Sequence, residues 1–124
     1  SANGSVCIYF YPQSQTFAKE IAASISEALP SKKNRGGTYG NYWETRYYHC
    51  PTIIIECGFV SNDDEFLWLS QNTDVTAERI AVGILNSLGK EMPEPEPDTS
   101  SDSTSSEPLV VTETAAPARR EDML

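Results

Sequence analysis

The first 88 residues alternate between short apolar runs and stripes of apolar residues at helical spacing. The apolar and aromatic run over residues 6–11, which Pro12 ends, predicts a buried strand. From Ser14, a suitable N-cap, large apolar residues recur every three to four positions until Pro30 stops the pattern. This stripe predicts a helix that packs on a core, and its members are Phe17, Ile21, Ile25, Ala28 and Leu29.

The next segments are less regular. Residues 31–42 are polar and contain three glycines, which predicts a loop, and residues 44–48 suggest a short extended piece. Pro51 then opens a β-branched run over residues 52–55 that has no polar alternation. Such a run is typical of a central strand that is covered on both faces.

Two further helices follow. Ser61 or Asn62 can cap a helix whose first turn is acidic, and acidic side chains stabilise the positive end of a helix. A last helix is expected over residues 74–88, with Gly89 as its C′ residue. Its apolar side consists of Ala77, Ile80, Ala81, Ile84, Leu85 and Leu88. The order of elements predicts an α/β fold, with a mixed or parallel sheet and flanking helices. Two strands are few for such a sheet, so we expect more strands upstream.

The composition changes near Gly89. Residues 90–124 contain five prolines, a Ser/Thr run over residues 99–106 and no aromatic residue. Residues 89–124 hold nine acidic and three basic side chains. We therefore divide the chain into a globular domain, 1–89, and a disordered acidic Pro/Ser/Thr-rich tail, 90–124. The apolar island at residues 109–111 is either a docking motif or part of a plain spacer.

The overall charge excludes some partners. The formal net charge is −9, which argues against nucleic acid and against anionic lipid, because both require clustered basic side chains. No apolar run approaches the roughly 18–20 residues that span a bilayer. The three cysteines are an odd number and do not form a disulfide-framework pattern, so they are expected to behave as small apolar residues.

Glu56 does not fit its apolar surroundings. Three isoleucines precede it and Cys57 to Val60 follow. A carboxylate at the end of a buried strand costs desolvation energy unless it binds something, and ligands of α/β sheets sit at strand ends. Glu56 is therefore a candidate for general acid/base chemistry. The alternative is a structural glutamate that caps a neighbouring helix or pairs with Arg35 or Arg46.

Other candidate features carry two interpretations each. Lys32, Lys33 and Arg35 either contact a carboxylate of a ligand or belong to a solvated loop. The aromatic cluster either stacks on sugars or packs at the sheet edge; its members are Tyr39, Tyr42, Trp43, Tyr47 and Tyr48. His49 is more plausible as an ordinary loop histidine than as a metal ligand, because its distances from Cys50 and Cys57 along the chain match no zinc spacing.

The segment over residues 51–62, Pro-Thr-Ile-Ile-Ile-Glu-Cys-Gly-Phe-Val-Ser-Asn, resembles the signature of zinc-dependent N-acetylmuramoyl-L-alanine amidases. Residues 34–36, Asn-Arg-Gly, resemble a second element of that family. The likeness covers residues 1–89, which would form the C-terminal part of the amidase domain.

The resemblance implies a peptidoglycan hydrolase with Glu56 as its catalytic glutamate. The family holds a zinc with two histidines and one glutamate, and the metal activates a water against the amide between N-acetylmuramic acid and L-alanine. All three ligands lie upstream of residue 1 in the family, so none is expected in this chain. The alternative function is a non-catalytic amidase-like module that binds muropeptide or a protein partner. The resemblance also implies an extracellular or cell-wall location.

Overall fold

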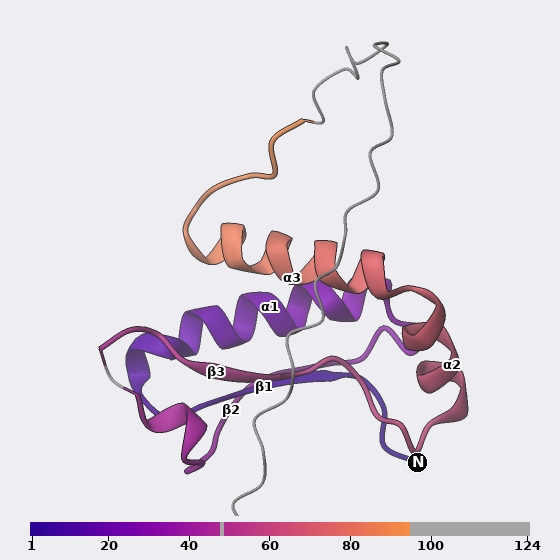
Figure 1. The fold of residues 1–124 in the computed structure, drawn as a ribbon, viewed down its shortest axis with the longest axis horizontal. Coiled ribbons are helices and arrows are strands. Elements are labelled where there is room, and N and C mark those ends of the chain that lie inside the picture. Colours follow the sequence, from indigo (N-terminus) through magenta and orange to yellow (C-terminus); the bar gives the residue numbers. More distant parts are fainter. Residues whose placement is uncertain (48, 95–124) are drawn as a thin grey trace, which may run out of the picture. The chain divides into compact units, whose positions relative to one another are not determined.

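Three strands and three α-helices make up the part of the chain that the structure, a computed structural model, describes: residues 1–47 and 49–94 (Figure 1). In chain order these elements are β1 (Ser5–Tyr9), α1 (Gln15–Ala28), β2 (Asn34–Tyr39), β3 (Ile53–Glu56), α2 (Asp63–Gln71) and α3 (Thr73–Ser87). Two short 3-10 turns are added, η1 (Pro12–Ser14) before α1 and η2 (Glu44–Arg46) before β3.

The strands form one mixed sheet with the order β2-β1-β3. Strand β1 runs parallel to β2, with α1 as the crossover, and antiparallel to β3. The predicted α/β class is confirmed. The prediction that the isoleucine run forms a central strand is wrong for the described residues, because β3 lies at an edge and β1 lies in the middle. All four residues of β3 are only half-buried, since one helix layer covers just one face of the sheet.

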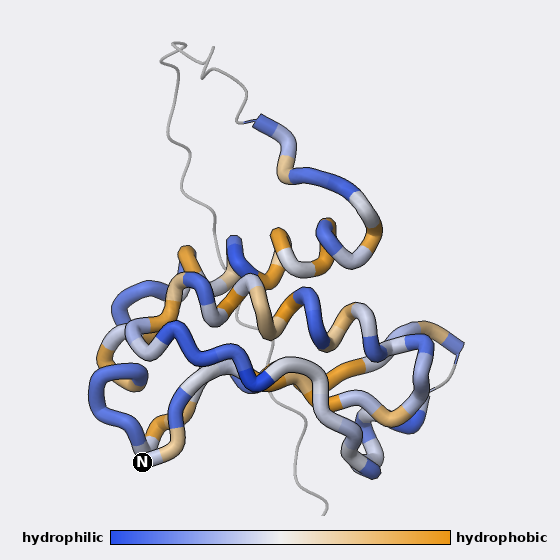
Figure 2. Tube along the Cα trace, turned by 180° about the vertical axis from the view of Figure 1, so that it is seen from behind, coloured by the Kyte–Doolittle hydropathy of each residue, from blue (hydrophilic) through white to orange (hydrophobic). Residues whose placement is uncertain are grey.

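Helix α1 covers that face and supplies most of the core. The buried apolar residues are Cys7, Ala18, Ile21, Ala22, Ile25 and Leu29. Each of them but Cys7 and Leu29 belongs to α1, so the predicted helical stripe is confirmed as a core stripe. Figure 2 shows the fold from behind, with hydrophobic stretches in the strands and along the helices.

Helix α3 packs on the outer side of α1, so the layers are sheet, α1 and α3 (Figure 1). The residue that α3 buries is Gly83, where an added Cβ would lie 2.5 Å from the Cα of Ile21. The predicted helix is confirmed, but its apolar side is only partly buried. Ile84 and Leu88 remain exposed because the close approach to α1 is centred on the glycine.

Residues 31–46 contradict two predictions. The expected loop contains β2, and the expected extended piece is the 3-10 turn η2. Strand β2 carries no apolar alternation. Its backbone pairs with β1, and Gly37 passes close to α1, so no apolar side chain is needed to hold it. A Cβ on Gly37 would lie 3.0 Å from that of Ala18. The strand is thus fixed by backbone pairing and by the lack of a side chain, neither of which gives a hydrophobic pattern.

Two of the predicted helix ends are confirmed, whereas Ser14 stands at the N-cap position of α1 without a capping side-chain hydrogen bond. The side chain of Asn62 caps α2 by accepting a hydrogen bond from the backbone N–H of Glu65, at 3.2 Å. Gly89 has a φ of 66° after α3, and Lys90 donates to the carbonyl of Leu85 at 2.9 Å, as in a Schellman motif. Most of the predicted tail, residues 95–124, lies outside the described residues.

Candidate functional site

Glu56 is the last residue of β3, opposite Val6 on the neighbouring strand. Successive side chains of a strand point to opposite faces. Ile53 and Ile55 pack against the core under α1, so Glu56 belongs to the face of the sheet that points away from α1. Its side chain is half-buried there. The carboxylate makes no hydrogen bond or ion pair with another residue of the described ranges.

The structural roles considered for Glu56 are taken by other groups. The Nε of Arg35 donates to the carbonyl of Asn3 at 2.5 Å. The Nε of Arg46 donates to Oδ1 of Asn41 at 2.7 Å. The N-cap of the following helix is Asn62. Within the described residues neither guanidinium forms an ion pair with Glu56, and the carboxylate is not used as a cap.

A second glutamate, Glu65 in the first turn of α2, is the buried one. Only 1% of it is exposed. Its Oε1 accepts hydrogen bonds from the backbone N–H of Gly4 at 2.7 Å and from the hydroxyl of Ser31 at 2.5 Å. Its Oε2 accepts a hydrogen bond from the backbone N–H of Phe59 at 3.2 Å. One side chain thus ties together the entry to β1, the turn after α1 and the loop after β3.

The loop between the two glutamates passes very close to α2. A Cβ on Gly58 would lie 2.8 Å from Cδ1 of Leu69 and 3.1 Å from Oε2 of Glu65. Gly58 thus allows a close approach of the backbone to the helix. Gly58 and Glu65 together therefore fix the direction in which the chain leaves β3, immediately after Glu56.

The thiols beside this loop are kept protonated. Burial raises the pKa of Cys7 to about 12, with smaller contributions from the nearby Cys57 and Glu56. Burial also raises the pKa of Cys57. A thiol nucleophile needs a lowered pKa, so these cysteines act as small apolar residues, as expected from the sequence.

Arg35 lies near the same loop. Its guanidinium carbon is 5.0 Å from the centroid of the Phe59 ring, which is cation–π distance. Phe59 follows Glu56 by three residues, so Arg35 is part of the surroundings of the candidate site. Its role in binding substrate stays a prediction.

The residues at this site do not fit a zinc ion by themselves. No cluster of three His, Cys, Asp or Glu side chains suitable for a metal occurs within residues 1–47 and 49–94. His49 is exposed, and its ring lies 5.6 Å from that of Tyr47, before β3, while Glu56 lies at the other end of that strand. Glu56 is therefore not accompanied by zinc ligands in the described part of the chain.

The aromatic cluster is largely exposed, although the ring of Tyr39, at the end of the edge strand β2, lies 5.5 Å from the ring of Phe10. Its described members are exposed: Tyr39 by 60%, Tyr42 by 51%, Trp43 by 83% and Tyr47 by 60%. These four side chains are therefore largely accessible to a ligand, and sugar stacking stays a prediction. Tyr48 lies outside the described residues.

An α/β sheet with a half-buried, unengaged carboxylate at the end of a strand defines a candidate acid/base site, a kind of site common among hydrolases. The chain belongs to the N-acetylmuramoyl-L-alanine amidase family, whose sequence profile matches residues 1–86. No curated protein and no solved structure matched the chain.

Family membership confirms the resemblance noted for residues 51–62 and 34–36, and it associates the chain with amide hydrolysis in the peptidoglycan of the cell wall. None of the helices within the described ranges has the length and hydrophobicity to cross a membrane.

Proposed function

We propose that this chain supplies the catalytic glutamate of a peptidoglycan hydrolase, and that Glu56 is that residue. The substrate bond is the amide between N-acetylmuramic acid and the L-alanine of the stem peptide. The enzyme would act outside the cell or at its wall. Family membership supports the reaction class.

The observation that carries this proposal is the contrast between the two glutamates. Glu65 is buried and its oxygens accept three hydrogen bonds, so it has no capacity left for a substrate. Glu56 is half-buried at a strand end, and its carboxylate makes no hydrogen bond or ion pair with a described residue. A carboxylate that is partly desolvated but unpaired can accept a proton from an attacking water and return it to the leaving amine.

The zinc of this reaction would be held by residues outside the 124 of this sequence. The part of this chain would be to present the Glu56 carboxylate on the sheet face away from α1. The loop that Gly58 and Glu65 fix would keep that carboxylate in place. Arg35, beside Phe59, would lie close enough to that loop to contact a carboxylate of the stem peptide.

The test is the substitution Glu56→Gln in a protein that includes the upstream zinc ligands. Glutamine preserves the shape but cannot accept the proton, so release of stem peptides from purified peptidoglycan should fall by roughly 100-fold or more. Bound zinc should stay unchanged. The matched control is Glu78→Gln, an exposed residue of α3. Full activity of the Glu56 variant would refute the assigned role.

A second candidate function is a non-catalytic module that binds muropeptide or a protein partner. It is favoured by the lack of a three-ligand metal cluster within the described residues. Both candidates predict that the purified 124-residue chain binds no stoichiometric zinc, so release of stem peptides, and not metal analysis, separates them. We expect no stoichiometric zinc, and one tightly bound zinc per chain would overturn the view that the ligands lie elsewhere.

A further inference from the structure

Four exposed aromatic rings gather in one short segment, residues 39–47. Trp43 is the extreme case, because 83% of it is exposed. Large aromatic side chains normally contribute to cores, and a cluster of exposed ones marks a surface that binds something. The segment begins at the last residue of β2, includes η2 and ends before β3.

The backbone that carries these rings is held firmly. Thr45 is 1% exposed, and its single hydroxyl proton is shared between the carbonyls of Gly40 at 3.1 Å and Tyr42 at 3.0 Å. Beyond the segment, directly before β3, the backbone N–H of Thr52 donates to the hydroxyl of the buried Ser14 at 3.0 Å. The exposed rings are therefore presented by an ordered frame, which lowers the entropic cost of binding a ligand.

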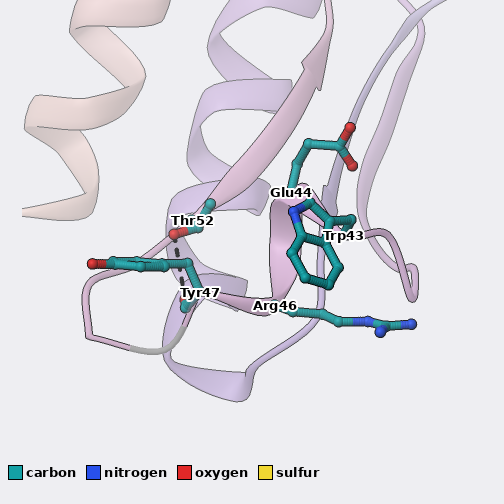
Figure 3. A pocket seen from close by; sticks show the side chains of 5 residues that line it. All are labelled: Trp43, Glu44, Arg46, Tyr47 and Thr52. Carbon is teal, nitrogen blue, oxygen red and sulfur yellow. Dashed lines mark hydrogen bonds between the residues drawn. The ribbon is translucent and has the colours of Figure 1, made fainter. Parts of the chain in front are cut away.

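Two of the four rings, those of Trp43 and Tyr47, border a cavity of about 460 Å³. Its lining consists of Trp43, Glu44, Arg46, Tyr47 and Thr52. In the view of Figure 3, the Tyr47 ring and the Trp43 indole lie on opposite sides of Thr52. A cavity of this size with aromatic walls and a few polar groups has the character of a small-molecule site.

The polar groups narrow the ligand class. One carboxylate, Glu44, and one guanidinium, Arg46, come from the same short turn, so the cavity offers both an acceptor and donors without a net charge. Flat apolar rings combined with such groups suit a pyranose ring, which has apolar C–H faces and a rim of hydroxyls. A polyanion is disfavoured, because the chain carries a net charge of −9.

The position of the cavity agrees with that of the candidate site. Thr52 directly precedes β3 and Glu56 ends it, so the two lie about 13 Å apart at roughly 3.3 Å per residue. Figure 1 shows the turn η2 on the side of the sheet away from α1, the side to which Glu56 belongs. A polymer that lies along this face can reach both places.

We propose that this cavity is a glycan subsite. It binds one N-acetylated amino-sugar unit of the peptidoglycan from which the enzyme, with Glu56 as its catalytic residue, releases the stem peptide. The inference rests on the proposed function for its choice of polymer. Trp43 and Tyr47 stack on the sugar faces, while Glu44 and Arg46 form hydrogen bonds with its hydroxyl and acetamido groups.

The test uses the 124-residue chain and a peptide-free probe, the tetramer of β-1,4-linked N-acetylglucosamine. Binding is followed by calorimetry and by tryptophan fluorescence, up to probe concentrations that saturate a ~1 mM site. The wild-type chain should bind. Trp43→Ala should weaken binding at least tenfold, and Tyr47→Ala should weaken it as well. Circular dichroism verifies that each variant is folded.

Two controls make the result specific. Phe66 on α2 is also an exposed aromatic residue, at 54%, but it does not line the cavity, so Phe66→Ala should bind the tetramer like the wild type. A sugar-free stem peptide should not compete with the tetramer. No binding by the wild type, an equal loss in the Phe66 variant, or displacement by the peptide would each overturn the subsite.

The outcome is independent of the catalytic proposal, because binding is measured without hydrolysis. Sugar binding that persists in Glu56→Gln, together with lost peptide release, supports both proposals. If peptide release depends on Glu56 but no sugar binding is found, the catalytic assignment is supported and the glycan subsite is refuted. If sugar binds but Glu56→Gln keeps full activity, only the catalytic assignment is refuted.

Discussion

Of the glutamates that the structure describes, Glu65 should be the one whose replacement by glutamine destabilises the fold most. Its carboxylate accepts hydrogen bonds from Gly4, Ser31 and Phe59 while 1% of the residue is exposed. In Glu65→Gln one carbonyl oxygen can still serve Gly4 and Ser31. The new amide group then faces the N–H of Phe59, where two donors meet and no bond forms.

The expected cost follows from these contacts. Leaving one buried donor unpaired costs about 1–3 kcal/mol, and the remaining bonds lose their charge assistance. We therefore expect Glu65→Gln to lower the free energy of unfolding by about 2–4 kcal/mol. For a domain of this size that corresponds to roughly 10–30 °C in melting temperature. Glu65→Ala leaves all three donors unpaired and should cost about 3–5 kcal/mol, a large part of the 5–15 kcal/mol of an ordinary domain.

Urea unfolding followed by far-ultraviolet circular dichroism measures this difference on the 124-residue chain. The control is Glu78→Gln, which removes the same charge from an exposed position of α3. A surface substitution of this kind should change the free energy of unfolding by less than about 0.5 kcal/mol. If Glu65→Gln falls within that same margin of the control, the carboxylate does not hold the three segments together and the reasoning fails.

Three further outcomes follow from the packing. Iodoacetamide at pH 8 should alkylate the exposed Cys50 well before the buried Cys7, as mass spectrometry would reveal; equal rates would contradict the burial. Because the folded-state pKa of Cys7 is raised from 9.0 to about 12, its contribution to stability is complete below pH 9 and declines as the pH rises towards 12. Alkaline unfolding of Cys7→Ala should therefore depend less steeply on pH than that of the wild type, and parallel curves would argue against the shift. Gly83→Ala should lower the free energy of unfolding in urea by about 1–3 kcal/mol, because the new methyl group meets the backbone of Ile21. The control Asn86→Ala, at an exposed position of the same helix, should lower it much less. A neutral Gly83→Ala would show that α1 and α3 can move apart freely.

The parts of the fold that could be predicted from sequence are those that leave a side-chain pattern. The stripe of α1 and the caps Asn62 and Gly89 have local chemical causes, and the structure places them as predicted. Strand β2 has no such pattern, since backbone pairing and Gly37 define it. The position of β3 at an edge was also not predictable, because an isoleucine run has the same composition at an edge and in the centre of a sheet.

The candidate site shows the same division. Glu56 stood out because a charge follows three isoleucines. Glu65 did not, because an acidic residue in the first turn of a helix is ordinary and needs no special explanation. Its burial depends on Gly4 and Ser31, which lie 61 and 34 residues away along the chain. The signal that could have indicated it is the spacing Asn62-x-x-Glu65, a variant of the capping-box pattern.

The two glutamates therefore divide folding and chemistry between them. Glu65 closes three chain segments around its carboxylate, and the N–H of Phe59 is one of the groups that it holds. That bond fixes the loop that follows Glu56 in the chain. The carboxylate of Glu56 itself lies on the sheet face that points away from α1, without a hydrogen-bond or ion-pair partner among the described residues. Glutamine at position 56 should accordingly leave the urea midpoint unchanged and remove activity, because no native hydrogen bond is lost. Glutamine at position 65 should lower the midpoint first, and should reduce activity only as far as the loop loses its place. If Glu56→Gln destabilises the chain as strongly as Glu65→Gln, then Glu56 also has a structural partner and its availability for proton transfer is disproved.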